Sequence, residues 1–383
     1  TIFQADLIDK TGFGKAKVGK QKCQICGKQH HEDKNFWKNL LEQWKELTTN
    51  FIMMLRDSHV SWDVASKVMR FILPCSKGKA MYLFNEKIEQ FEYSQDNFLI
   101  INYDEQHPKK GRTQRFRLTL LNYKTRTPIA DELFDSKDDV TIEAFLRKHL
   151  DTEKEIVIIT DCDRRYPAIF QKIWGKKVIH QKCLLHLNKL VVNDFGRNIS
   201  LQNIHHLYLI LNIFYNRKKE IRFIERILKK IDRKKFMTAT QKNDWSKKQK
   251  AKFFEHVRNL EKERRRQGKN LLQRSLRQAE KVVKLLWQQI NLFPKQARKR
   301  LEMIKENWES FTAFYKIEGC PATNNAIENY YSTSLKTHRK KQMRSDKGIV
   351  NQMKLSALKR IEGFPAPKRT FLEIYGLIGL IAS

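Results

Sequence analysis

The sequence has few acidic residues for its length, few cysteines and no long hydrophobic run. It contains 42 Asp and Glu against 76 Lys and Arg, and its formal net charge is +34. A run of about 18 apolar residues would be needed to span a bilayer, and because none occurs the sequence does not support a membrane role. The six cysteines are spaced irregularly in a chain of 383 residues, which indicates reduced intracellular thiols and excludes a disulfide framework.

What the chain has in excess is basic charge, spread along most of its length. Lys and Arg neutralise phosphates and release condensed counterions, so a surface this basic predicts a nucleic acid as partner. A ribosome-associated or merely basic protein is the alternative. Hydrophobic residues make up 40% of the chain and aromatic residues 11%, which is enough to fold. We therefore expect a folded protein located with DNA, in the cytoplasm with the nucleoid of a prokaryote or in the nucleus of a eukaryote.

The N-terminal part divides into a polar segment and a helical region. Residues 1–35 are polar and predict little regular structure outside a possible zinc knuckle. They lack a signal-peptide pattern. Because they also lack an initiating Met, we expect a trimmed or incomplete N-terminus. Residues 36–95 predict a helical DNA-binding region, with one amphipathic helix from Phe36 to about Leu55 and another from a Ser61 cap to about Ile72. This pair fits a helix-turn-helix or an ordinary helical hairpin.

Residues 96–190 alternate between short apolar runs and amphipathic segments. The runs predict strands over Phe98–Tyr103, Arg115–Leu121, Pro128–Leu133, Glu155–Thr160 and Lys177–His180. Helices are predicted over Thr141–Leu150 and Arg164–Trp174. This order of elements predicts an α/β fold with a mixed sheet and flanking helices.

The rest of the chain predicts helices in three segments. Residues 191–318 form a basic helical insertion, whose cationic runs and amphipathic helices fit either a surface for duplex DNA or a dimer contact. Residues 319–360 add the final helices of the core, one of which carries Glu328 and has Thr323 or Asn324 as its N-cap. Residues 361–383 are a C-terminal segment without a functional signal.

Two acidic residues directly follow the two most hydrophobic predicted strands. They are Asp104 and Asp161, and if the strands are parallel neighbours the carboxylates meet at one edge of the sheet. Glu328, on a helix packed across that edge, would complete a set of oxygen ligands for two Mg²⁺ or Mn²⁺ ions about 4 Å apart, which suits phosphodiester cleavage. An Asp after a strand is also a common turn or cap residue. Glu105 and Asp163 are competing ligands.

Cysteine and histidine occur together at two other places. Cys183 and His186 have the spacing to face one way at the start of a helix, near His180, and the alternative is a half-buried thiol with a packed imidazole. Near the N-terminus a Cys-x-x-Cys pair precedes two adjacent histidines, which makes a Zn²⁺ site conceivable. The four candidate zinc ligands are Cys23, Cys26, His30 and His31.

The motifs follow one another in a characteristic order. Ile159-Thr160-Asp161 comes first, then Cys183-Leu184-Leu185-His186, then a basic helical stretch, and finally Thr323-Asn324-Asn325-Ala326-Ile327-Glu328-Asn329 with Lys336 and Arg339 downstream. Together with Asp104, this order resembles the DDE transposases that have an RNase H-like catalytic domain, especially the Mutator-like group of eukaryotic elements and its bacterial relatives. The resemblance covers roughly residues 95–345.

The resemblance implies metal-dependent cleavage at transposon ends and transfer of the freed 3′-hydroxyl into target DNA. Asp104, Asp161 and Glu328 would be the catalytic, metal-binding residues, and Cys183 with His186 would lie near the active site. A homodimer or higher oligomer on DNA is implied because two ends must be brought together. Contacts with DNA are expected from the last motif and the residues after it: Asn324, Asn325, Lys336, His338, Arg339, Lys340, Lys341 and Arg344.

Three other functions fit parts of the sequence. A domesticated, non-catalytic transposase would act as a DNA-binding regulator, although all three acidic residues are present. An RNase H-like nuclease or resolvase would cleave DNA without joining strands, so its products distinguish it. A basic, structural RNA-binding protein would give no reason for carboxylates beside two apolar strands.

Overall fold

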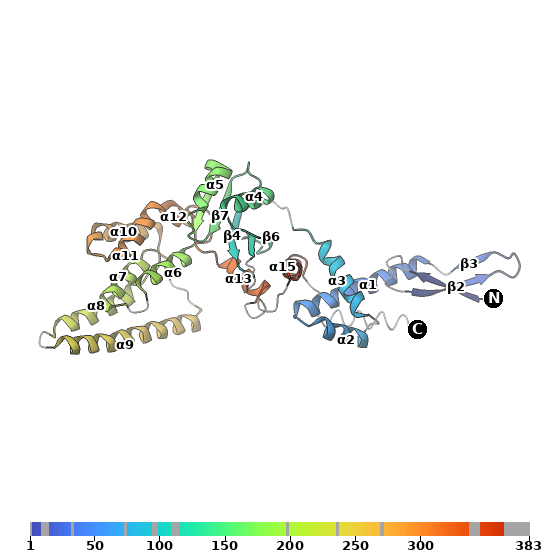
Figure 1. The fold of residues 1–383 in the computed structure, drawn as a ribbon, viewed down its shortest axis with the longest axis horizontal. Helices are drawn as coiled ribbons and strands as arrows, with labels where there is room; N and C mark the ends of the chain where they lie inside the picture. Colours follow the sequence, from blue (N-terminus) through green and yellow to red (C-terminus); the bar gives the residue numbers. More distant parts are fainter. Residues whose placement is uncertain are drawn as a thin grey trace.

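The molecule is elongated, with a sheet near its middle and helices on both sides (Figure 1). The computed structural model describes residues 2–8, 15–31, 34–72, 75–93, 99–108, 115–196, 199–234, 237–268, 272–336 and 345–363. A separate small sheet lies at the N-terminal end, and long helices form the opposite end. Across these described ranges, no helix is both long and apolar enough to cross a membrane.

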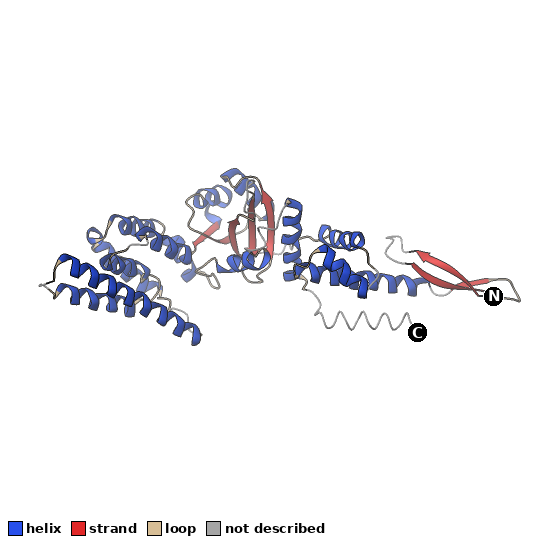
Figure 2. Ribbon diagram, turned by 60° about the horizontal axis from the view of Figure 1, so that its bottom comes forward, coloured by secondary structure: helices blue, strands red, loops and turns tan. Residues whose placement is uncertain are grey.

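The central sheet has the strand order β6-β5-β4-β7-β8. Its strands are β4 (Ile100–Gln106), β5 (Phe116–Asn122), β6 (Pro128–Phe134), β7 (Ile156–Thr160) and β8 (Val178–Lys182). β4, β5 and β6 are antiparallel neighbours, whereas β7 is parallel to β4 and β8 is parallel to β7. Helices cover this mixed sheet, as Figure 2 shows, so the predicted α/β class is confirmed.

The register between β4 and β7 aligns the two predicted aspartates. Ile100 lies opposite Val157 and Asn102 opposite Ile159, so two residues further along the same register Asp104 lies opposite Asp161. Asp161 directly follows β7, as predicted. Asp104 does not end its strand, because the antiparallel ladder with β5 continues through Gln106, and the prediction of a strand end there is wrong.

Helices pack on both faces and on one edge of the sheet. α4 (Asp139–His149) and α5 (Tyr166–Trp174) cover one face, where Tyr103 and Phe145 belong to the same core. α13 (Asn325–Ser334) packs on the other face. α12 (Trp308–Lys316) covers the edge strand β8, and its Phe314 N–H donates a 2.9 Å hydrogen bond to Gln181 Oε1.

Between β8 and α12 the described chain is almost entirely helical, as predicted. It contains α6 (Leu184–Phe195), α7 (Leu201–Leu211), α8 (Lys218–Asp232), α9 (Ala239–Arg266), α10 (Leu276–Gln288) and α11 (Lys295–Glu306). These helices share one apolar core that includes Ile204, Ile224 and Leu301. α9 contributes only Phe253 and Val257 to the buried residues, so most of this long helix is exposed.

Residues 1–35 have more regular structure than the sequence predicts. β1 (Ile2–Ile8), β2 (Lys15–Lys22) and β3 (Gln29–His31) form an antiparallel sheet, so the expectation of an irregular segment is wrong. The Cys23 N–H donates to Lys28 O at 2.8 Å, and Gly27 has a φ of +70°, which a glycine adopts without strain. This tight turn pairs β2 with β3.

The N-terminal helices share a core with a helix from the other end of the described chain. α1 (Lys34–Asp57) and α2 (Trp62–Ile72) agree with the predicted pair, and α3 (Lys77–Glu89) follows them. Ser61 Oγ accepts from Val64 N–H at 3.3 Å, as its predicted cap requires. α15 (Asp346–Ile361) contributes Leu355 and Leu358 to the same core and also packs on β6. Whether α1 and α2 act as a helix-turn-helix stays a prediction.

Candidate active site

Asp104 and Asp161 occupy equivalent positions on two neighbouring parallel strands. Both residues are half-buried. Asp104 Oδ1 accepts a hydrogen bond from Glu105 N–H at 2.8 Å, and Asp161 Oδ1 accepts one from Asp163 N–H at 2.9 Å. The backbone therefore fixes one oxygen of each carboxylate and leaves the other available.

Glu328 reaches this pair from the first turn of α13. The hydroxyl of Tyr331, one turn further along α13, donates to the Asp104 backbone carbonyl at 2.7 Å. This bond holds the helix against β4, and the carboxylates of Asp161 and Glu328 both act electrostatically on Asp104. The three predicted acidic residues therefore lie near enough to one another for the charges of Asp161 and Glu328 to act on Asp104.

The local electrostatics are those of a crowded group of carboxylates. Burial raises the pKa of Asp104 to about 8, and the charges of Asp161, Glu328 and Glu105 add to that rise. Burial and like charge both disfavour the ionised carboxylate. A bound cation would reverse this balance, so the donor set fits a hard divalent ion.

The side chains do not form an assembled metal site in the arrangement described. Among the residues placed by the structure, no three His, Cys, Asp or Glu side chains stand as a group that could hold a metal ion. Glu328 explains part of this, because its Oε1 lies 3.0 Å from Lys189 Nζ and 3.5 Å from His186 Nε2. The oxygens are of the right chemistry for Mg²⁺ or Mn²⁺, and Glu328 would have to turn away from Lys189 to join the aspartates.

Lys189 is a site residue that the sequence analysis missed. It lies on α6 three residues after His186, a spacing that places both side chains on the same face of a helix. Extending the Cys183-His186 pattern by one more turn would have identified it. Asn102 and Tyr331 were also not predicted, although the same helix and strand periodicities could have identified them. Asn102 lies two residues before Asp104 on β4, and Tyr331 lies three residues after Glu328 on α13, so each shares a face with a predicted acidic residue.

Cys183 joins the end of β7 to the start of α13. It is fully buried just before α6, and its N–H donates to Thr160 O at 2.9 Å. Its Sγ accepts from the Asn324 N–H at 3.1 Å. Burial raises the pKa of the Cys183 thiol, so it stays protonated at neutral pH. The charge of Glu328 also acts on this thiol, and His186, in the first turn of α6, lies next to Glu328.

Asn324 performs a different task from the predicted one. It occupies the N-cap position of α13, but its side chain makes no capping bond. Instead its Nδ2 donates to Tyr103 O at 2.9 Å, and its Oδ1 accepts from Asn102 Nδ2 at 2.6 Å. The residue is fully buried, which contradicts the prediction that it contacts DNA. Asn324 fixes the start of α13 to β4, whereas Asn325 is exposed.

A buried ion pair lies beneath α13. Asp131 on β6 accepts hydrogen bonds from Arg117 Nε at 2.7 Å and from Arg117 Nη2 at 2.5 Å. The same carboxylate accepts from Thr119 Oγ1 at 2.9 Å and from Tyr330 OH at 2.6 Å. Arg117 Nη1 also donates to Ser334 Oγ at 2.9 Å. Since Tyr330 and Ser334 belong to α13, this network fixes the orientation of the helix that carries Glu328.

The two competing carboxylates point to other partners. Glu105 Oε1 accepts from Tyr103 OH at 3.2 Å and from Tyr166 OH at 3.1 Å, on the face covered by α5. Asp163 pairs with Arg165, whose Nη2 lies 2.8 Å from Asp163 Oδ2. The geometry therefore favours Asp104 and Asp161 over their neighbours.

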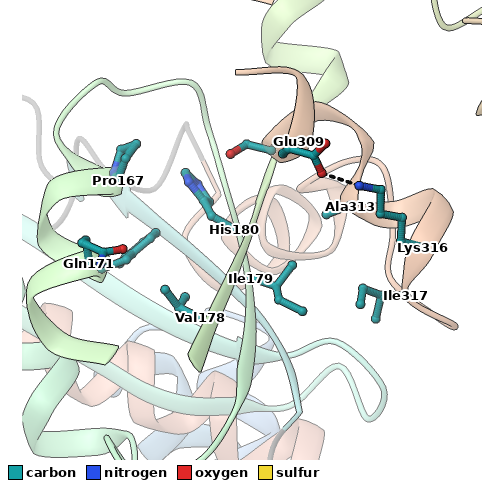
Figure 3. A pocket seen from close by; sticks show the side chains of 11 residues that line it. Pro167, Gln171, Val178, Ile179, His180, Glu309, Ala313, Lys316 and Ile317 are labelled. Carbon is teal, nitrogen blue, oxygen red and sulfur yellow. Dashed lines mark hydrogen bonds and ion pairs between the residues drawn. The ribbon is translucent and has the colours of Figure 1, made fainter. Parts of the chain in front are cut away.

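The sequence places His180 close enough to join the Cys183-His186 pair, but its imidazole contacts Thr160. Its Nε2 lies 2.8 Å from Thr160 Oγ1, and burial lowers the pKa of its imidazole to about 3, so the ring is neutral. Figure 3 shows His180 in a separate pocket of about 400 Å³ between α5, β8 and α12, where Glu309 and Lys316 form an ion pair.

The candidate zinc and DNA ligands are described only in part. Cys23 and Cys26 lie in the turn after β2, where backbone N–H groups and the Cys26 side chain lower the pKa of the Cys23 thiol. His30 and His31 belong to β3, but their side chains lie outside the described part of the chain. Lys336 is exposed after α13, whereas the other predicted DNA ligands fall outside the described residues: His338, Arg339, Lys340, Lys341 and Arg344.

Comparison with known proteins adds no assignment. No protein-family model matches the chain, and no curated protein matches it significantly.

Proposed function

We propose that the protein is a DNA transposase with an RNase H-like catalytic core, which cleaves transposon ends and transfers the 3′-hydroxyl into target DNA. The observation that carries this proposal is the parallel register that places Asp104 opposite Asp161, with Glu328 near enough to act electrostatically on Asp104. The strand order, with three antiparallel strands followed by two parallel ones, supports the RNase H-like assignment. So does the helical segment between β8 and α13, which separates the second aspartate from the glutamate.

In this proposal the chain's own residues divide the work between binding and positioning. Asp104, Asp161 and Glu328 would hold Mg²⁺ or Mn²⁺, which when bound would activate a water or 3′-hydroxyl and stabilise the leaving oxygen. Asn324 and Cys183 are positioning residues, since their hydrogen bonds set α13 and α6 against β4 and β7. Exposed basic residues would hold the DNA backbone. We also propose that the protein acts as an oligomer that brings two transposon ends together. A zinc site near the N-terminus is part of the same proposal.

The test is strand cleavage and joining by the purified chain with Mg²⁺ or Mn²⁺. Supercoiled plasmid and labelled DNA carrying candidate element ends would be compared for wild type, Asp161→Asn and Glu328→Gln. The amides keep shape but remove the charge that a metal ion needs, so we expect both variants to bind DNA and to lose cleavage at least about a hundredfold.

Asp163→Asn is the matched control for this experiment. Asp163 is two residues from Asp161, but its carboxylate pairs with Arg165, so the control should retain cleavage. Nicks without joined products would favour the nuclease alternative. Full DNA binding by wild type with no metal-dependent cleavage would overturn the proposal in favour of a DNA-binding regulator.

A further inference from the structure

A groove of about 510 Å³ lies beside the candidate active site, between α6, the end of α7 and the start of α8. Leu185 and Leu211 contribute apolar surface to it. Lys189, Arg217 and Asn193 supply cationic and amide groups, and no residue that lines the groove is acidic. Its two cations each pair with a carboxylate that lies outside the lining, Lys189 with Glu328 and Arg217 with Glu220.

One end of the groove is connected to the candidate active site through Lys189. Its Nζ contacts Glu328 Oε1 at 3.0 Å, so the side chain that lines the groove also touches a predicted metal ligand. α6 turns the same face toward the groove over two turns, because Leu185, Lys189 and Val192 are spaced by three and four residues. A ligand in the groove would therefore lie along α6 and end near the three carboxylates.

The other end of the groove leads to basic helices. Arg217 is mostly buried, its Nη1 lies 3.7 Å from Glu220 Oε1, and its Nε makes no hydrogen bond within the described chain. Its backbone N–H is fixed by Asn212 Oδ1 at 2.8 Å. Lys218 and Lys219 follow immediately and are exposed at the start of α8. Cationic side chains therefore extend from Lys189, next to Glu328, through Arg217 in the groove to Lys218 and Lys219 at the start of α8.

We propose that this groove holds the phosphodiester backbone of the DNA strand that enters the active site. The inference rests on the proposed function, and it adds a binding track that the motifs do not identify. Phosphates would contact Lys189, Asn193 and Arg217, while the apolar floor would contact sugars, a combination suited to a nucleic acid strand. The positive charge of the groove favours a DNA strand over a second copy of this chain, because the chain's own surface is strongly basic and would be repelled.

The experiment introduces negative charge at exposed positions of the groove. Val192 is 47% exposed and Asn193 is exposed, so Val192→Glu and Asn193→Glu should leave the fold intact, as circular dichroism would check. Val140→Glu on α4, where the valine is 76% exposed, is a matched control away from the groove. Fluorescence anisotropy with labelled DNA in EDTA would measure affinity over a range of salt concentrations, so that metal-dependent cleavage does not intervene.

We expect each groove variant to bind DNA about threefold to tenfold more weakly than Val140→Glu, with a salt slope smaller by about 1. Groove variants that bind like Val140→Glu would overturn the inference, even if wild type cleaves and joins DNA. A change in self-association by sedimentation with unchanged DNA binding would also overturn it, in favour of a contact between copies. Weakened binding in a protein that never cleaves DNA would leave the groove assignment standing and reject the transposase proposal.

Discussion

Cys183 shows how a single side chain can connect two parts of a site. Its sulfur accepts the Asn324 N–H, and its own N–H reaches the carbonyl at the end of β7. A buried donor that loses its acceptor costs more than the original bond contributed. The role of this cysteine is therefore one of position, and its raised thiol pKa makes it a poor nucleophile at neutral pH.

Replacing Cys183 should loosen the start of α13. Cys183→Ala leaves the buried Asn324 N–H without an acceptor, and we expect a loss of about 1–3 kcal/mol in the free energy of unfolding. Cys183→Ser keeps an acceptor and should lose less. Denaturation in urea measures the stability, and hydrogen exchange of the peptide that contains Asn324 locates the effect.

Cys320→Ala is the matched control for this prediction. Cys320 is also buried, but its Sγ–H donates a weak 3.8 Å hydrogen bond to the Pro321 carbonyl, whereas the Cys183 Sγ accepts one from a backbone N–H. Its replacement removes packing and this weak bond, but leaves no backbone N–H without an acceptor. If exchange at Asn324 rises equally in the Cys183 and Cys320 variants, the specific hydrogen bond is not what holds α13.

At the scale of elements, the orientation of α13 depends on the buried Arg117-Asp131 pair. Both side chains are fully excluded from solvent, and four hydrogen bonds satisfy the Asp131 carboxylate. An ion pair in such a place is costly to break, since the remaining charge is buried without a partner. The intact pair therefore holds α13 in its docked position through Tyr330 and Ser334.

Asp131→Asn should destabilise the protein by about 3–5 kcal/mol, because Arg117 stays buried and charged. Adding Arg117→Met removes that charge, so the double variant should be more stable than Asp131→Asn alone. Glu153→Gln, which breaks an exposed 2.8 Å pair with Lys177, should cost less than about 1 kcal/mol. Urea denaturation would measure all four proteins. A double variant less stable than Asp131→Asn would contradict the unpaired-charge explanation.

The sequence was informative about elements wherever hydrophobic spacing was strong. The apolar run before Asp161 and the helical spacing in α1 and α2 matched the structure closely. Spacing did not predict β1 and β2, because β2 is rich in lysine and polar residues and its extended form depends on antiparallel pairing with the neighbouring β1 and β3. It also could not place the end of β4, which the ladder with β5 extends past Asp104.

Within the candidate site, the sequence pointed to Asp104, Asp161 and Glu328 but gave no information about the orientation of their side chains. Choosing between Asp104 and Glu105 requires knowing which face of β4 is covered by α5, and that depends on tertiary packing. Glu105 shares a face with Tyr103 and contacts Tyr166, whereas Asp104 points the other way with Asn102. The same limit explains Asn324, whose burial against β4 no local pattern reveals.

At the scale of the whole molecule, the dominant property is a net charge of +34 on an elongated shape. Such a surface presents cations along its length and should contact many phosphates at once. We expect the affinity for duplex DNA to fall about 10³-fold or more between roughly 50 and 200 mM salt, which corresponds to six or more neutralised phosphates. Anisotropy titrations at several salt concentrations measure this slope, and a DNA analogue with an uncharged backbone is the control. A nearly flat salt dependence would rule out phosphate contacts as the basis of binding.

The shared core of α1, α2, α3 and α15 has a consequence for how the protein is made. The ribosome releases the first helices long before Leu355 and Leu358 leave the exit tunnel, so the N-terminal helices must wait for their last partner. During that interval their apolar faces stay open to chaperones or to aggregation. A nascent chain interrupted within the helical insertion would lack this closing helix, and cellular proteases could recognise it by the same uncovered surface.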